Sequence, residues 1–185
     1  YLRETAGASR ANEILRTRLM TAVWRVRLMQ PLHSEEWIFY VNQKGSAYRF
    51  DHVLDEKAPG AQLSQEEARK IAEQYLSARQ GIPAESYTLV DSQQEKHDHR
   101  TDYSFVWEDP GFRAGDARFR VSLHMVGNET CEFRPFLKLP EAWLREFQKT
   151  RLASFLAPAL LGACGVPLLI AFLRRLGARD QRFHW

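Results

Sequence analysis

Hydrophobic and polar residues alternate along several stretches between residues 22 and 137, as they do in strands of a sheet with one face in solvent. The clearest stretch is 116–125, in which every second side chain is apolar and the side chains between them are polar. Gly127-Asn128 and the run from Asn42 to Gly45 are turn sequences that join neighbouring strands as hairpins. The pattern predicts strands at 22–29, 36–42, 46–54, 87–94, 102–108, 116–126 and 129–137.

Other segments have helical periodicity. A helix is predicted over 9–20, and another begins at Pro140, a residue tolerated in a first turn. The best-defined helix starts at Ser64 with a capping box completed by Glu67, and Gly81 ends it in a left-handed conformation. Its apolar side chains recur at helical spacing: Ala68, Ile71, Ala72, Tyr75 and Leu76.

Strand runs joined by hairpins, with helices between the runs, indicate an α+β fold with antiparallel sheets and packed helices. A helix followed by a strand meander occurs about twice. The predicted organisation is a first helix and three-stranded meander over 1–60 and a second such unit with a membrane-proximal helix over 61–151. A transmembrane helix over 152–173 and a basic juxtamembrane segment over 174–185 follow.

The segment 152–173, LASFLAPALLGACGVPLLIAFL, contains no charged residue. About 20 apolar residues in a helix span the hydrocarbon core of a bilayer, so this segment predicts a transmembrane helix. The alternative is a buried helix of a globular domain, which Pro158 and Pro167 make less favourable because lipid-embedded helices tolerate interior prolines better. We expect one continuous helix from Pro140 into the membrane, bent near Pro158.

Charge is distributed unevenly. Of 26 basic and 23 acidic residues, four arginines and one aspartate follow residue 151, so residues 1–151 are neutral. A neutral domain argues against nucleic acid as a partner, because nucleic-acid binding needs a basic face. The arginines after 173 predict a cytoplasmic end there, with residues 1–150 on the extracytoplasmic side of a cell membrane. The chain does not begin with Met, and we expect it to be part of a longer membrane protein.

Candidate chemistry is sparse. His97, His99 and Asp102 form a metal-like cluster, with His52 elsewhere in the sequence, and the two histidines would point the same way if they lay on a strand. The alternative is a polar loop between two strands. The pair Glu66-Glu67 belongs to a helix first turn, and Glu35-Glu36 precedes a strand with side chains facing opposite ways. We therefore expect no catalytic residue and no cofactor in this chain, with metal binding at the histidine cluster as a weaker alternative.

Cys131 and Cys164 are the two cysteines of the chain, and no disulfide between them is expected, because the second lies in the predicted membrane segment. Aromatic residues concentrate on the predicted strands, and most of them should belong to the core. Those on the second face of a one-layer sheet could line a binding groove. The aromatic residues on the predicted strands are Trp24, Trp37, Phe39, Tyr40, Tyr48, Phe50, Phe105, Trp107 and Phe119.

Several short stretches together resemble the extracytoplasmic region that precedes the catalytic core in some bacterial intramembrane metalloproteases of the CAAX protease and bacteriocin-processing (CPBP, or Abi) family. The stretches are Trp24 to Arg27, Phe50 to His52, Pro59 to Ala61, Arg100 to Glu108 and Leu139 to Trp143. The helix around Glu66-Glu67-Ala68-Arg69, followed by strands, also resembles PepSY-type domains.

In that family a Glu-Glu pair is followed by Arg four positions later, whereas Ile71 stands at that distance after Glu67, so no catalytic residue is carried over. The resemblance implies a non-catalytic domain that senses, gates or recruits substrate for a membrane-embedded metalloendopeptidase whose catalytic core this chain lacks. The alternative is a self-standing, membrane-anchored module that binds a peptide or an envelope component. A third possibility is an enzyme that uses the His97 cluster. The expected partners are the lipid bilayer, a peptide or protein substrate and the missing catalytic domain.

Overall fold

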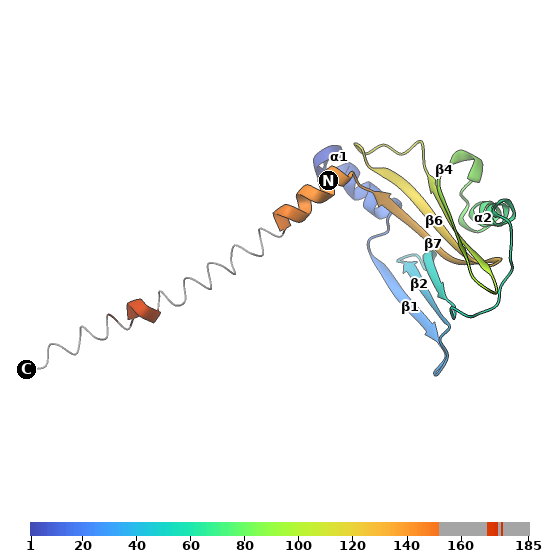
Figure 1. Ribbon diagram of the computed structural model, residues 1–185. Coiled ribbons are helices and arrows are strands. Elements are labelled where there is room, and N and C mark those ends of the chain that lie inside the picture. The colour runs from blue at the N-terminus through green and yellow to red at the C-terminus, as the bar shows by residue number, and fades with distance from the viewer. Residues whose placement is uncertain (152–169, 174, 176–185) are drawn as a thin grey trace, which may run out of the picture. The chain divides into compact units, whose positions relative to one another are not determined.

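The computed structural model describes residues 1–151, 170–173 and 175 (Figure 1). Contacts divide the chain into two units, Tyr1–Leu139 and Pro140–Trp185, and each unit is described by itself. Every strand among the described residues lies in the first unit. The predicted boundaries at residues 60 and 151 remain predictions.

The first unit is built on a seven-stranded antiparallel sheet, which confirms the predicted α+β fold class. Each predicted strand is present, and the strands lie in the order β1-β2-β3-β7-β6-β5-β4. Their bounds are β1 Val23–Met29, β2 Glu36–Asn42, β3 Ala47–Val53, β4 Thr88–Lys96, β5 Thr101–Glu108, β6 Arg118–Val126 and β7 Glu129–Lys138.

The first meander, β1 to β3, and the second, β4 to β7, belong to the same sheet. They join where β3 pairs with β7, through Phe50 opposite Phe133 and Asp51 opposite Glu132. A pairing between strands so distant in sequence cannot be read from local patterns. The two helix-plus-meander units expected over 1–60 and 61–151 thus share one continuous sheet.

Helix α2, Gln65–Gln80, has the ends that its sequence predicts. The Ser64 hydroxyl accepts a hydrogen bond from the Glu67 amide, the Glu67 carboxylate accepts one from the Ser64 amide, and Gly81 is left-handed at φ 63°. Helix α1 was predicted over 9–20 but spans Leu2–Thr17, with a non-helical Gly7 inside it. Its first turns are held by a tertiary contact, because the Asp116 amide donates a 2.7 Å hydrogen bond to the Tyr1 hydroxyl oxygen.

The core lies between one face of the sheet and the helices. Along β6 the apolar side chains are buried and the polar ones between them are partly exposed, which confirms the predicted sheet with one wet face. Tyr75 of α2 contacts the rings of Phe50 and Phe133, so α2 also covers the junction between β3 and β7. The largest fully buried side chains are Trp107, Tyr103, Phe105, Ile14, Leu76, Leu123 and Met125.

In the second unit, residues 141–151 are helical, as are 170–173 and 175. Trp143 and Phe147 stack on one another along the first of these segments, with ring centroids 5.0 Å apart. Most of the predicted transmembrane helix (152–173), the predicted bend at Pro158 and most of the basic segment 174–185 lie outside the described residues. Among the residues that are described, no helix is long and apolar enough to cross a membrane.

Candidate functional site

The edge strand β1 carries large apolar side chains that remain in contact with solvent. Trp24 is 72% exposed and Leu28 57% exposed, and Val26 between them is 41% exposed. The strand pairs with β2 over its whole length without a register shift, so its hydrogen-bonding pattern is regular. In the part of the chain that the structure describes, no strand pairs with the outer side of β1 (Figure 1).

These side chains continue the core face of the sheet. Residues directly opposite one another in an antiparallel pair lie on the same face, and the facing pairs are Trp24 with Val41, Val26 with Phe39 and Leu28 with Trp37. Phe39 in turn faces Phe50, which is buried beneath α2. We call this surface the β1–β2 face; it consists of Trp24, Val26, Leu28, Trp37 and Phe39.

The prediction that most strand aromatics are core residues is confirmed for Phe50, Phe105, Trp107 and Phe119, which are buried. It is wrong for Trp24. The physical reason is position in the sheet, since β1 is the outermost strand and the cover provided by α2 reaches only as far as β3 and β7.

The opposite edge of the sheet has a different character. Strand β4 is interrupted by a register shift between Leu89 and Asp91 and carries Glu95 and Lys96 toward its end. Bulges and charged side chains on an edge strand discourage pairing with another chain. Strand β1 lacks a bulge and presents apolar side chains on one face, with Arg25 and Arg27 on the other face, so the two edges differ mainly in the bulge of β4 and the exposed apolar face of β1.

Charged and polar groups adjoin β1. Arg25 and Arg27 lie on the strand between the residues of the apolar face, and Arg27 forms an ion pair with Glu36 of β2. A shallow hollow of about 320 Å³ lies at the end of β1 and is lined by Leu28, Met29, Gln30, His33, Glu35 and Trp37. The hollow therefore adjoins the β1–β2 face.

His97 and His99 lie in the connection between β4 and β5 and not on a strand. The strand geometry that would have pointed both side chains toward one zinc ion is therefore absent here, and the polar-loop alternative agrees with the structure. His97 Nε2 is 3.2 Å from a carboxylate oxygen of Asp102, whereas His99 is exposed. Asp102 also accepts a hydrogen bond from the Gly127 amide and pairs with the buried Arg100. Asp102 thus has structural partners that a metal ion would have to displace.

Arg100 and Asp102 form a buried clasp that fixes the loop between β3 and α2. The Arg100 guanidinium donates hydrogen bonds to both Asp102 carboxylate oxygens at 3.1 Å and to the carbonyl oxygens of Asp55 and Ala58. Gly60 lies against this clasp, where an added Cβ would be 3.1 Å from the Arg100 side chain. Two of the stretches that carry the family resemblance therefore contact each other.

The paired glutamates have separate partners. Glu66 and Glu67 lie in the first turn of α2, as predicted, and hydrogen bonds from the Ser64 side chain and backbone lower the pKa of Glu67. Glu36 pairs with Arg27, whereas Glu35 accepts a hydrogen bond from His52. The two side chains thus serve different neighbours, in keeping with the expectation that they face opposite ways.

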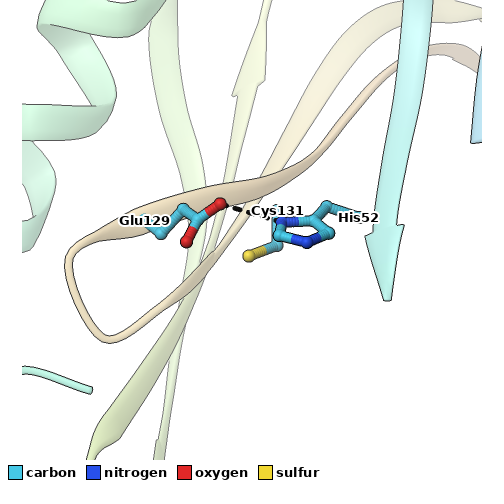
Figure 2. Close-up of side chains that lie close together, drawn as sticks. All are labelled: His52, Glu129 and Cys131. Atoms are coloured by element: carbon cyan, nitrogen blue, oxygen red, sulfur yellow. Dashed lines mark hydrogen bonds and ion pairs between the residues drawn. The ribbon is translucent and has the colours of Figure 1, made fainter. Parts of the chain in front are cut away.

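A different group of potential metal ligands comes together from β3 and β7. His52, Glu129 and Cys131 place their ligand atoms within 4.8 Å of one another (Figure 2). His52 Nδ1 is 2.8 Å from a carboxylate oxygen of Glu129, and His52 Nε2 is 2.9 Å from one of Glu35. This group is not predicted from the sequence, because it depends on the pairing of β3 with β7 and no local motif marks it.

Cys131 is buried at 2% exposure. Burial, followed in importance by the charge of Glu129, raises the pKa of the Cys131 thiol to about 12. The sulfur is therefore a protonated thiol near neutral pH and a poor nucleophile, because the thiolate is the reactive form. The proximity of one nitrogen, one oxygen and one sulfur atom makes this group a candidate metal site, in which the metal ion would have to displace the thiol proton.

Comparisons with known proteins give no assignment: no family model matches the chain, and neither a curated protein nor a solved structure matches it.

Proposed function

We propose that residues 1–151 form a non-catalytic domain that recruits an extended polypeptide segment by adding it as a strand to the outer side of β1. The observation that carries this proposal is the regular, exposed and apolar edge strand with Trp24, Val26 and Leu28 on one face. An extended segment that joins a sheet edge gains main-chain hydrogen bonds, and its alternate side chains supply specificity.

The β1–β2 face defines the chemistry of the segment. On that face, alternate side chains of an added strand would lie beside Trp24, Val26 and Leu28, and they should be apolar to extend the same surface. On the other face they would lie beside Arg25 and Arg27, where acidic side chains are favoured over basic ones. The preferred segment therefore alternates apolar residues with polar or acidic residues.

The sequence supports a proposal for the membrane attachment, the topology and the parent protein of this domain. The apolar run 152–173 supports attachment to a cell membrane by a transmembrane helix, and the arginines after it support an extracytoplasmic position for residues 1–150. The resemblance to the region before the catalytic core of CPBP-family proteases supports a parent protein that is a membrane-embedded metalloendopeptidase. In that setting the recruited segment is a substrate or a regulatory peptide.

A second candidate is a self-standing membrane-anchored module that uses the same edge strand for a peptide or an envelope component. The complete reading frame separates the two candidates, because only the protease requires further apolar helices with paired Glu and His motifs. The topology is tested with a reporter that is active only in the cytoplasm, fused near Gly60. An extracytoplasmic position of residues 1–150 predicts that this reporter is inactive.

The recruiting role is tested with a displayed library of peptides of about ten residues, selected on the full chain in nanodiscs. Enriched peptides should show the alternation described above and should bind Val26→Arg at least about tenfold more weakly than the wild type. Val90→Arg is the matched control, since Val90 is also 41% exposed and lies on the opposite edge strand β4. Equal binding by both variants, or enriched peptides that lack this alternation, would contradict the proposal.

A further inference from the structure

We propose that His52, Glu129 and Cys131 form a binding site for a divalent metal ion of the zinc class, which ties the two meanders of the sheet together. This site is independent of the recruiting role of β1. The three side chains supply one nitrogen, one oxygen and one sulfur ligand, all within 4.8 Å of one another. Zinc accepts these ligand types in tetrahedral sites.

The backbone explains why the ligands converge. Strands β3 and β7 pair through Phe50 with Phe133 and Asp51 with Glu132, and His52 and Cys131 are the residues that come next to this paired stretch on the two strands. The pairing of β6 with β7 shifts register between His124 and Met125, on the stretch of β7 that contains Cys131. Such bulges re-aim side chains and are frequent beside functional sites.

The ligand atoms lie close enough together for a small ion to gather them. Ligand atoms about 2.0–2.3 Å from a zinc ion at tetrahedral angles lie about 3–4 Å from one another. His52 Nδ1 and the Glu129 carboxylate oxygen are already 2.8 Å apart in a hydrogen bond. A metal ion would replace the proton between them, and the fourth position would be left to water.

The surroundings orient the imidazole as they do in known metal sites. Metal-bound histidines commonly donate their second ring N–H to a carboxylate, which fixes the ring and raises its basicity. His52 Nε2 is 2.9 Å from Glu35, so Nδ1 is the nitrogen that faces the other two ligands. The indole of Trp37 lies flat against the same ring and limits its rotation.

The choice of metal follows from the ligand types. A thiolate and an imidazole select zinc and related transition metals over magnesium or calcium, which prefer oxygen ligands only. Cys131 binds as a thiolate, so formation of the metal–sulfur bond releases the thiol proton to solvent, and affinity rises with pH. The two carboxylates, Glu129 and Glu35, offset the charge of the ion.

The test is titration of the full chain with Co²⁺, all proteins carrying Cys164→Ser so that a thiolate signal can arise only from Cys131. One equivalent should produce the charge-transfer absorbance of a cobalt–thiolate bond, and Zn²⁺ should displace it. Cys131→Ser and Glu129→Gln should remove the signal, and Glu35→Gln should weaken binding by about 10–100-fold. His97→Ala is the matched control and should bind as the wild type does.

Circular dichroism establishes that each variant is folded. Should Cys131→Ser fail to fold, Glu129→Gln decides the matter, because the Glu129 side chain is about half exposed and its amide preserves the shape. The proposed metal site would be contradicted if the folded Cys164→Ser parent showed no cobalt–thiolate absorbance, or if this absorbance persisted in Glu129→Gln. His52 would then be a structural link between two carboxylates. Neither result bears on peptide binding at β1.

Discussion

The imidazole of His52 lies flat against the indole of Trp37, with ring centroids 3.6 Å apart and planes 12° from parallel. Trp37 also faces Leu28 across β1 and β2 and so belongs to the β1–β2 face. The proposed peptide edge and the proposed metal site are therefore adjacent and share one residue. The two proposed sites are thus neighbours, although neither proposal depends on the other.

Truncation of the side chain should hardly change the free energy of unfolding at Trp24 and should lower it strongly at Trp107. Trp24→Ser should change the free energy of unfolding by no more than about 0.5 kcal/mol, because the side chain is largely exposed. Trp107→Ala should cost about 3–5 kcal/mol, because that side chain is 1% exposed in the core. Denaturant unfolding of the two variants measures both values. A large loss for Trp24→Ser would mean that the edge strand contributes to folding and is not reserved for binding.

The Arg100–Asp102 clasp should be a major source of stability. Arg100→Ala removes the cation that pairs with the buried Asp102 carboxylate and the donor to two loop carbonyl groups, and we expect a loss of about 3–5 kcal/mol. The control is Arg10→Ala, which removes an exposed pair with Glu13 and should cost less than about 1 kcal/mol. Similar losses for the two variants would show that the clasp is not the determinant of the loop between β3 and α2.

Local signals in the sequence were sufficient for most of the fold. The capping box at Ser64, the left-handed Gly81 and the alternation along β6 each depend on neighbouring residues, and each was predicted correctly. The start of α1 was missed because the Tyr1 hydroxyl contacts Asp116, a residue far away in the sequence. Periodicity reports which residues repeat, and it does not report such tertiary contacts.

The candidate sites were harder to predict for the same reason. The apolar pattern of β1 resembles that of any core strand, and its exposure follows from its place at the edge of the sheet. His52 and Cys131 come together only through the pairing of β3 with β7. His97 and His99 stood out because they are close in sequence, yet they lie in a connection between two strands.

In the metal-free protein, Cys131 should react slowly with alkylating agents. The pKa of its thiol is raised to about 12 from 9.0, so the thiolate fraction at pH 8 should be about a thousandfold lower than for an ordinary cysteine. Iodoacetamide labelling with a chelator present, compared between folded and denatured Cys164→Ser protein, measures this. Rapid labelling of the folded protein would contradict the burial of the thiol.

The raised pKa of the Cys131 thiol also makes the free energy of unfolding depend on pH. A thiol whose pKa is raised on folding favours the folded state fully below the unfolded pKa of 9.0, and this contribution is lost as pH rises toward 12. The free energy of unfolding should therefore fall more steeply above pH 9 in the wild type than in Cys131→Ser. Parallel curves would show that Cys131 does not titrate as its burial implies.

The central claim is that β1 accepts an added strand, and amide hydrogen exchange tests it most directly. Every second amide of an edge strand points away from its single neighbour and lacks a strand partner. On addition of a selected peptide to the full chain in nanodiscs, exchange should slow at alternate residues of Val23–Met29 and remain unchanged along Thr88–Lys96. Peptide binding that leaves the amides of β1 unprotected, or that protects β4 instead, would contradict the account.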